Sequence, residues 1–181
     1  MEEPRSPVTS EVQFMAVKQK ERIQLKIARI KKELAADKKR WGGYYDDSRG
    51  LRYLPPELYL KIQDYDGAQR YFNWFYKNFP DDSGYPVFLF EWAITLFKKG
   101  KMKEAKAKIL QTDLANSYII PTFLQVENLR PPTKAYSSWQ MPDLAEEMKY
   151  SKNDTKLADF ASWLNDFVSG MEFTQFRGDL L

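Results

Sequence analysis

The sequence predicts an all-α fold of antiparallel helical hairpins, capped by a long N-terminal helix and a C-terminal helix. Apolar residues recur at helical spacing along most of the chain, and no stretch sustains the alternation of apolar and polar residues typical of a strand. The segment 86–97, PVFLFEWAITLF, carries one charge, Glu91, and is apolar on every side of a helix. A helix that is apolar all round is buried all round, so we expect this segment to be the centre of the core.

The composition fits one domain, or one domain with an arm, within the 181 residues. Hydrophobic residues make up 43% of the chain, which is enough for a sizeable core. Cysteine and histidine are both absent, which removes disulfides, thiolate metal ligands and the commonest general base, so we expect neither a metal nor a cofactor. The apolar segment is shorter than the roughly 20 residues of a membrane span, and the N-terminus lacks a signal-peptide core. We therefore expect a cytoplasmic protein without a membrane partner.

The N-terminal part is expected to consist of a disordered stretch, 1–9, and a long basic helix, 10–42. Ser10 followed by Gln13 is typical of a helix start, and the glycines after Trp41 end the pattern. An apolar row runs along this helix through Ile23, Ile27, Ile30, Leu34 and Trp41. Ten basic and three acidic residues lie between positions 18 and 40. A helix of this kind can lie across a core or pair with a second copy, so it is the candidate element for a homo-oligomer.

The rest of the chain follows a polar connector, 44–52. Apolar spacing and turn residues predict helices over 55–62, 65–79, 86–97, 101–115, 118–128, 143–150 and 154–169, a loop over 131–142 and a tail over 171–181. Asp82 or Ser83 is the expected cap of the central helix, and Gly100 is its expected stop. The stripe on the segment 154–169 is broad and aromatic, which suits a capping helix.

Two stretches of the chain are similar at an offset of 37 residues, Gln63–Ala68 and Gly100–Ala105. Each begins with a polar turn, reaches an alanine and continues into a second helix with a large apolar residue. Helical hairpins repeated at about 34 residues resemble tetratricopeptide repeats, here over 52–118. The matching positions are Tyr59, Ala68, Phe72 and Pro80 in the first repeat, and Leu89, Trp92, Ala93, Leu96, Gly100, Ala105 and Ile109 in the second. Both repeats are degenerate, because Arg52, Pro55, Pro56 and Ser117 depart from the family pattern.

The resemblance implies a non-enzymatic scaffold that binds another protein in a groove lined by the first helix of each repeat. The groove-facing positions are Tyr53, Glu57, Leu60, Phe90, Ile94 and Phe97. The basic and asparagine residues with which some family members hold a peptide carboxylate are absent from these positions, so the expected groove is apolar. A soluble monomer rarely exposes such a row. We expect residues 154–169 to cover it in the free protein, which leaves the basic helix or the loop 131–142 for the partner.

The basic helix keeps a second function open, namely binding of nucleic acid through residues 18–40. Its cations would attract phosphates, foremost Lys31, Lys32, Lys38, Lys39 and Arg40. The apolar row on the same helix requires burial, however, and no aromatic residues interleave with the lysines to stack on bases. Catalysis is not expected, because the adjacent carboxylates Asp46-Asp47 and Asp81-Asp82 lie in turns instead of converging from different elements. The sequence therefore favours a protein-binding adaptor over a nucleic-acid-binding accessory protein.

Overall fold

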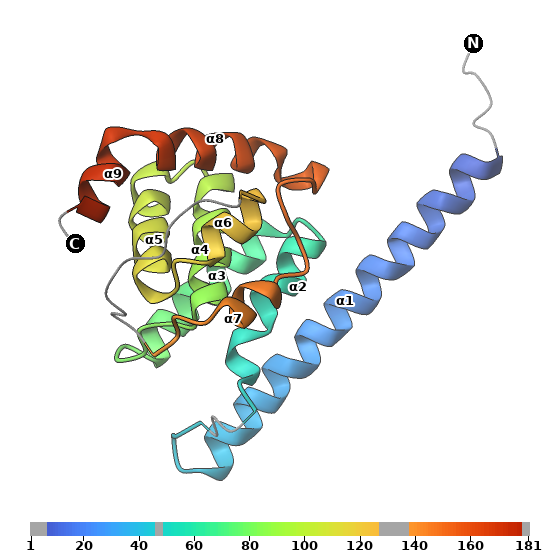
Figure 1. Cartoon of the computed structure of the whole chain (residues 1–181). Coiled ribbons are helices and arrows are strands. Elements are labelled where there is room, and N and C mark those ends of the chain that lie inside the picture. Colours follow the sequence, from blue (N-terminus) through green and yellow to red (C-terminus); the bar gives the residue numbers. More distant parts are fainter. Residues whose placement is uncertain (1–6, 46–48, 127–137, 179–181) are drawn as a thin grey trace. The chain divides into compact units, whose positions relative to one another are not determined.

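The computed structural model describes residues 7–45, 49–126 and 138–178, with side chains from residue 12 onward. The chain divides into two compact units, residues 1–64 and residues 65–181, which we call the N-terminal unit and the C-terminal unit. Regular structure in the described residues is helical throughout, apart from one isolated bridge between Trp41 and Tyr44 (Figure 1). The predicted all-α fold class is confirmed.

The N-terminal unit contains a long helix, α1 (Pro7–Arg40), a 3-10 turn, η1 (Leu51–Tyr53), and a short helix, α2 (Pro55–Lys61). The second half of α1 packs against η1 and α2. Ile27, Ile30 and Leu34 are buried, as the apolar row predicted. Trp41 was expected to extend this row but is exposed, because the helix has already ended one residue earlier.

The start of α1 corrects the expected disordered stretch 1–9, since the helix already includes residues 7–9. Pro7 is the first helical residue. Proline fits there because the first N–H groups of a helix have no intrahelical acceptor, so nothing is lost when one is missing. Residues 1–6 lie outside the described part.

The C-terminal unit is organised around α4 (Pro86–Lys98), drawn in green in Figure 1. The other helices of this unit are α3 (Tyr65–Asn78), α5 (Met102–Ala115), α6 (Ile119–Leu124), α7 (Pro142–Glu146), α8 (Ala158–Ser169) and α9 (Met171–Gly178), with a 3-10 turn, η2 (Thr155–Leu157), before α8. Helix α4 packs against α3, α5, α6, α7 and α8. This arrangement confirms that the apolar segment is the centre of the core.

The two ends of α4 differ in how well their caps were predicted. At the C-terminal end, Gly100 adopts a left-handed φ of 71°. Its N–H donates to the Phe97 carbonyl and that of Lys101 donates to the Leu96 carbonyl, both at 2.9 Å, which forms a Schellman motif. At the N-terminal end the residue before the helix is Tyr85, without a side-chain cap. Asp82 instead accepts the Gly84 N–H at 2.8 Å, so the expected cap is wrong.

Three segments near the C-terminus differ from the prediction, and in one of them the helix expected over 143–150 already ends at Glu146. Helix α6 ends at Leu124 because Gln125 turns left-handed, with a φ of 52°. The expected helix 118–128 is therefore too long in its described part, and residues 127–137, with most of the loop 131–142, lie outside the description. The expected tail 171–181 contains α9, whose Phe173 is buried against Phe167 of α8 at 5.6 Å between ring centroids. An isolated aromatic residue in a polar segment carries too weak a period to predict this helix.

Helices α4 and α5, which cover the expected second repeat, are consecutive and pack against each other. Ala93 of α4 and Ala105 of α5 are completely buried, and small side chains at such positions let two helices approach closely. In the first repeat the boundary between the two units falls at Asp64, between α2 and α3. A hairpin of α2 with α3 therefore stays a prediction.

Candidate functional site

The apolar row expected to line a groove is covered by the chain itself. Phe160 of α8 lies 5.6 Å from Phe90 and 5.4 Å from Phe97, measured between ring centroids. Trp163 adds a second aromatic contact to Phe97 at 5.0 Å, and Ile94 is completely buried. The expectation that residues 154–169 cover this row is confirmed. Phe90 and Ile94 are consequently enclosed in the core instead of being presented to a partner.

The other three groove positions belong to the N-terminal unit. Leu60 of α2 is buried, and Tyr53 of η1 is half-buried with its hydroxyl 3.2 Å from the Arg52 guanidinium. Glu57 pairs with Lys61 one turn later at 2.5 Å. These side chains therefore already have partners or cover within the folded chain.

The first half of α1 presents a different surface. Every described side chain from residue 12 to residue 22 is exposed, and the large apolar ones among them expose 55–64% of their area. These residues are Val12, Phe14, Met15 and Val17, and Leu25 is exposed further along. Val12 lies on the helix face that continues as the buried row Ile27, Ile30 and Leu34, and Met15 lies at the edge of this face. This face, which we call the apolar stripe, begins in solvent and ends in the core, and it is interrupted by Gln19 and Lys20.

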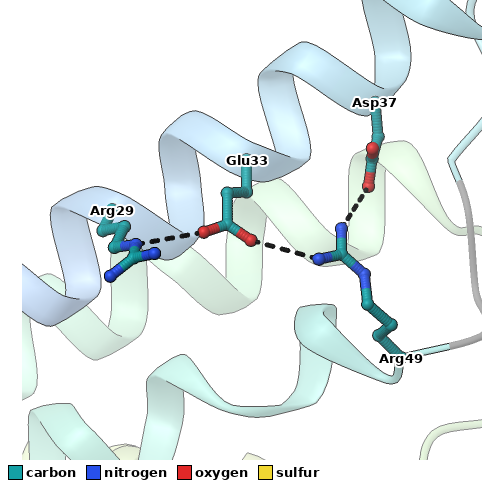
Figure 2. A network of polar contacts seen from close by, with 4 residues as sticks. All are labelled: Arg29, Glu33, Asp37 and Arg49. Carbon is teal, nitrogen blue, oxygen red and sulfur yellow. Dashed lines mark hydrogen bonds and ion pairs between the residues drawn. The ribbon is translucent and has the colours of Figure 1, made fainter.

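The acidic residues in the second half of α1 are already engaged. Figure 2 shows Arg49 reaching between Glu33, at 3.4 Å, and Asp37, at 3.6 Å. Arg29 approaches the other oxygen of Glu33 at 3.2 Å. Because Glu33 and Asp37 are paired, the charge that this helix offers to a partner is mainly positive.

The basic residues named from the sequence are all exposed on α1. Lys38 lies over the ring of Tyr45 at 5.5 Å from its centroid. Within the described part of the chain, Lys31, Lys32, Lys39 and Arg40 form no ion pair. The structure therefore leaves these four cations available, but they lie on a helix that also carries an exposed apolar stripe.

A cavity of about 580 Å³ opens between α3, α4 and α5 in the C-terminal unit. Its aromatic wall is formed by Phe75, Tyr76, Phe79, Trp92 and Trp139. The loop 80–84 and the α5 residues Lys108, Gln111, Leu114 and Ala115 complete the lining. The cavity is open to solvent and combines aromatic surface with one cation, which are features of a ligand site.

Lys108 is held in this cavity by an aromatic contact. Its ammonium lies 3.9 Å from the ring centroid of Trp92 and donates to the Gln111 side-chain oxygen at 2.8 Å. The opposite contact of Trp92 is Phe72, which stacks on it at 4.8 Å with an interplanar angle of 10°. Burial lowers the pKa of Lys108 below its usual value, because a partly dry environment disfavours the charged amine.

A polar cluster at the end of α5 fixes the remaining aromatic wall. The buried Asn116 amide donates to the carbonyls of Trp139 and Met141, both at 2.8 Å. The Gln140 side-chain oxygen accepts the N–H of Ser117 at 3.0 Å and its hydroxyl at 3.1 Å. Trp139 therefore lies against the cavity because buried hydrogen bonds hold its backbone.

Sequence reasoning missed this cavity and placed Trp92 with the core of the repeat. One feature of the α5 sequence indicates that Lys108 lies next to the buried face of the helix. It directly precedes the fully buried Ile109 and lies one turn after the buried Ala105. Leu110 and Leu114 of α5 are only half-buried, and Leu114 lines the cavity. The contribution of Trp139 depends on contacts with Asn116, which lies 23 residues earlier in the chain.

The described residues contain no group of three or more acidic side chains arranged to hold a metal ion. Within the same residues, no helix combines the length and the apolar character needed to cross a membrane. Comparisons with protein-family models, curated proteins and solved structures give no match. The candidate functional sites of the described residues are therefore two exposed surfaces, the first half of α1 and the cavity.

Proposed function

We propose that this chain is a non-enzymatic adaptor that binds another protein through the first half of α1. The tetratricopeptide-like hairpin of α4 and α5 serves as the rigid part of the scaffold. The partner is an acidic, amphipathic segment that continues the packing of the apolar stripe beyond Ile27. The single observation that carries this proposal is the exposure of Val12, on the face of the buried row, and of Met15, at the edge of that face.

The stripe needs a partner for its own stability. An isolated helical segment of about 15 residues is only marginally stable in water, and most helices are stabilised by packing of an apolar face. The first half of α1 lacks such packing in the free chain, since its described side chains are exposed as far as residue 22. A docked segment supplies the missing contacts.

The charge of α1 specifies the chemistry of the partner. Between residues 12 and 32 the helix carries seven basic residues and one acidic residue, Glu21. A second copy of the chain would place like charges side by side, which disfavours the expected homo-oligomer through this helix. An acidic segment complements the charge and also accelerates association.

Nucleic acid is the second candidate, favoured by the exposed cations Lys31, Lys32, Lys39 and Arg40. Phosphate binding would use the cations of α1 but would leave Val12 and Met15 in solvent. Binding of nucleic acid also weakens steeply with salt, because each neutralised phosphate releases condensed counterions. The two candidates thus differ in how they respond to apolar substitutions and to salt.

The test compares two probes by fluorescence anisotropy, a designed acidic amphipathic helical peptide and a duplex DNA of about two helical turns. Replacing Val12 and Met15 by serine should weaken peptide binding about tenfold or more, because buried apolar area is lost. Phe14 and Leu25 are exposed on the opposite face of α1, so replacing both by serine is the matched control and should change binding less than twofold.

The outcome for DNA decides between the candidates. If DNA binds more tightly than the peptide, with a steep salt dependence and no effect of the Val12 and Met15 replacements, the nucleic-acid function is correct. If both pairs of serine replacements weaken peptide binding equally, the stripe is not the docking face and the adaptor proposal fails in this form.

A further inference from the structure

The ammonium of Lys108 is a half-buried cation that forms no ion pair with the described residues. Its described contacts are the Trp92 ring and the neutral Gln111 side chain. An amine partly removed from water is destabilised unless an anion compensates it. The acidic residue of the cavity lining, Asp82, accepts the Gly84 N–H at one oxygen. A negative charge beside Lys108 would therefore compensate an ammonium that is not ion-paired in the described part of the chain.

We propose that this cavity binds a peptide segment of a partner protein in which a bulky apolar side chain stands next to a glutamate or aspartate. The apolar side chain packs against Trp92, Phe79 and Trp139, and the carboxylate pairs with Lys108. This site lies wholly within the C-terminal unit, so the inference does not depend on the docking function proposed for α1.

The aromatic walls determine the apolar part of the ligand. Trp92 is fixed from behind by Phe72, and Phe72 is in turn held edge-on by Phe88 at 5.0 Å. Trp139 is held through the Asn116 hydrogen bonds to the surrounding backbone. These rings lose little freedom when a ligand binds, which favours affinity because the entropic cost of ordering the site is already met in the free protein.

Lys108, the one cation in the cavity lining, determines the polar group of the ligand and disfavours cationic ligands and nucleic acids. A cationic ligand would be repelled by Lys108. A nucleic acid requires several cations spaced along its backbone, whereas the cavity lining contains one. A carboxylate accepts a hydrogen bond from the ammonium and also compensates its charge, which the neutral Gln111 oxygen does not do.

The size and opening of the cavity favour a peptide segment. A volume of about 580 Å³ lies within the range of sites that hold large side chains or small ligands. The open side lets the chain of the partner continue on both sides of the bound residues. The loop 80–84 forms part of the rim, and Gly84 allows this close approach: a Cβ at this position would lie 2.7 Å from the Leu89 side chain.

The experiment uses the full chain and a panel of fluorescein-labelled, C-terminally amidated octapeptides. Each contains one glutamate beside a tryptophan, phenylalanine, leucine, isoleucine or methionine, and each has a twin with glutamine in place of glutamate. For at least one member, the glutamate form should bind at least tenfold more tightly than its twin. The unmodified protein suffices for this comparison, so it does not depend on the folding of any variant.

Two lysine variants test whether Lys108 is the residue that binds the peptide carboxylate. Lys108→Met keeps most of the apolar stem and should abolish the difference between the twins. Lys103→Met, an exposed position on the same helix, changes the net charge equally and should leave the difference intact. The bound glutamate peptide should also protect Lys108 from acetylation, read by mass spectrometry, relative to Lys103.

Three results would overturn the proposal. One is equal binding of every glutamate peptide and its glutamine twin. Another is a loss of the preference in Lys103→Met as large as that in Lys108→Met, which would indicate a general effect of charge. The third is the failure of the whole panel to bind at millimolar concentration. Each of these results leaves the proposed role of α1 untouched, because that role is tested with variants of the N-terminal unit.

Discussion

Helices α1 and α4 obtain their stability in opposite ways. Helix α4 has 13 residues, almost all apolar, and packs against five helices of its unit. Helix α1 has 34 residues and is amphipathic, but only its second half packs against other elements of its unit. The shorter helix is therefore fixed by tertiary contacts, whereas the first half of the longer one depends on local helix formation.

Aromatic side chains of the two helices differ in how far they are buried, and therefore in how much they contribute to stability. Phe90 of α4 is completely buried between Phe123 and Phe160, and its ring is part of the core. Phe14 of α1 is 57% exposed and lies beneath the ammonium of Lys18 at 4.4 Å. Burial of apolar area is the main favourable term in folding, so only the first of these rings contributes strongly to it.

The largest expected effect comes from truncating these two rings. Phe90→Ala should lower the free energy of unfolding by about 3–5 kcal/mol, because it removes buried area and leaves a cavity. Phe14→Ala should change it by less than about 0.5 kcal/mol, as exposed substitutions usually do. Urea unfolding followed by far-UV circular dichroism measures both. Similar losses in the two variants would mean that the first half of α1 is packed in the free protein.

The ion pairs of the two units differ in the exposure of their arginine. In the N-terminal unit, the exposed Arg49 joins the partly exposed Glu33 and the buried Asp37 (Figure 2). In the C-terminal unit, the Nε of Arg177 on α9 lies 3.1 Å from a carboxylate oxygen of the buried Asp113 of α5. Burial raises the pKa of Asp113 to about 6, although the Arg177 charge opposes this shift.

This pair predicts an unusual pH dependence. The folded protein holds the Asp113 proton more tightly than the unfolded chain, in which an aspartate has a pKa of about 3.9. The contribution of this group to stability is therefore largest below pH 4, falls as the pH rises from about 4 to about 6, and then stays low. The expected change is on the order of 2–3 kcal/mol, obtained from urea unfolding at a series of pH values.

Asp113→Asn is the variant that isolates this effect, because asparagine does not titrate. It should flatten the stability profile between pH 4 and 6. Asp66 changes stability in the opposite sense: the hydrogen bond and charge of Lys99 lower its pKa, so its contribution is lost only at more acidic pH. A profile that rises between pH 4 and 6 in the unmodified protein would contradict the assignment to Asp113.

Much of the fold follows from local signals in the sequence. The all-round apolar pattern of 86–97 identified α4 as the centre, and the stripe Leu157, Phe160, Leu164 identified the covering helix. Both signals are periods within one helix, which a sequence displays directly. The helix α9 was missed because its burial rests on one residue, Phe173, and on the distant pair of Asp113 with Arg177.

The candidate sites could be predicted less well, for a physical reason. A site made of several elements depends on how they pack, and the α3–α5 cavity joins Phe79, Trp92, Lys108 and Trp139 from four separate segments. From the sequence, the apolar residues of α1 could only be expected to be buried. In the structure α1 packs against α2 and η1, which are short, so they cover the second half of α1 and leave the first half exposed.

The smallest expected effect comes from the residues that terminate α2 and α4. Gln63 after α2 and Gly100 after α4 have left-handed φ values of 55° and 71°, and both turns contain the same pair of backbone hydrogen bonds. A left-handed conformation costs a residue with a side chain roughly 1 kcal/mol and costs glycine little. Gln63→Gly should therefore stabilise the chain by up to about 1 kcal/mol, and Gly100→Gln should destabilise it by a similar amount, measured by thermal and urea unfolding. If both replacements change stability in the same direction, the two turns are not equivalent, and the similarity between Gln63–Ala68 and Gly100–Ala105 would lose its structural meaning.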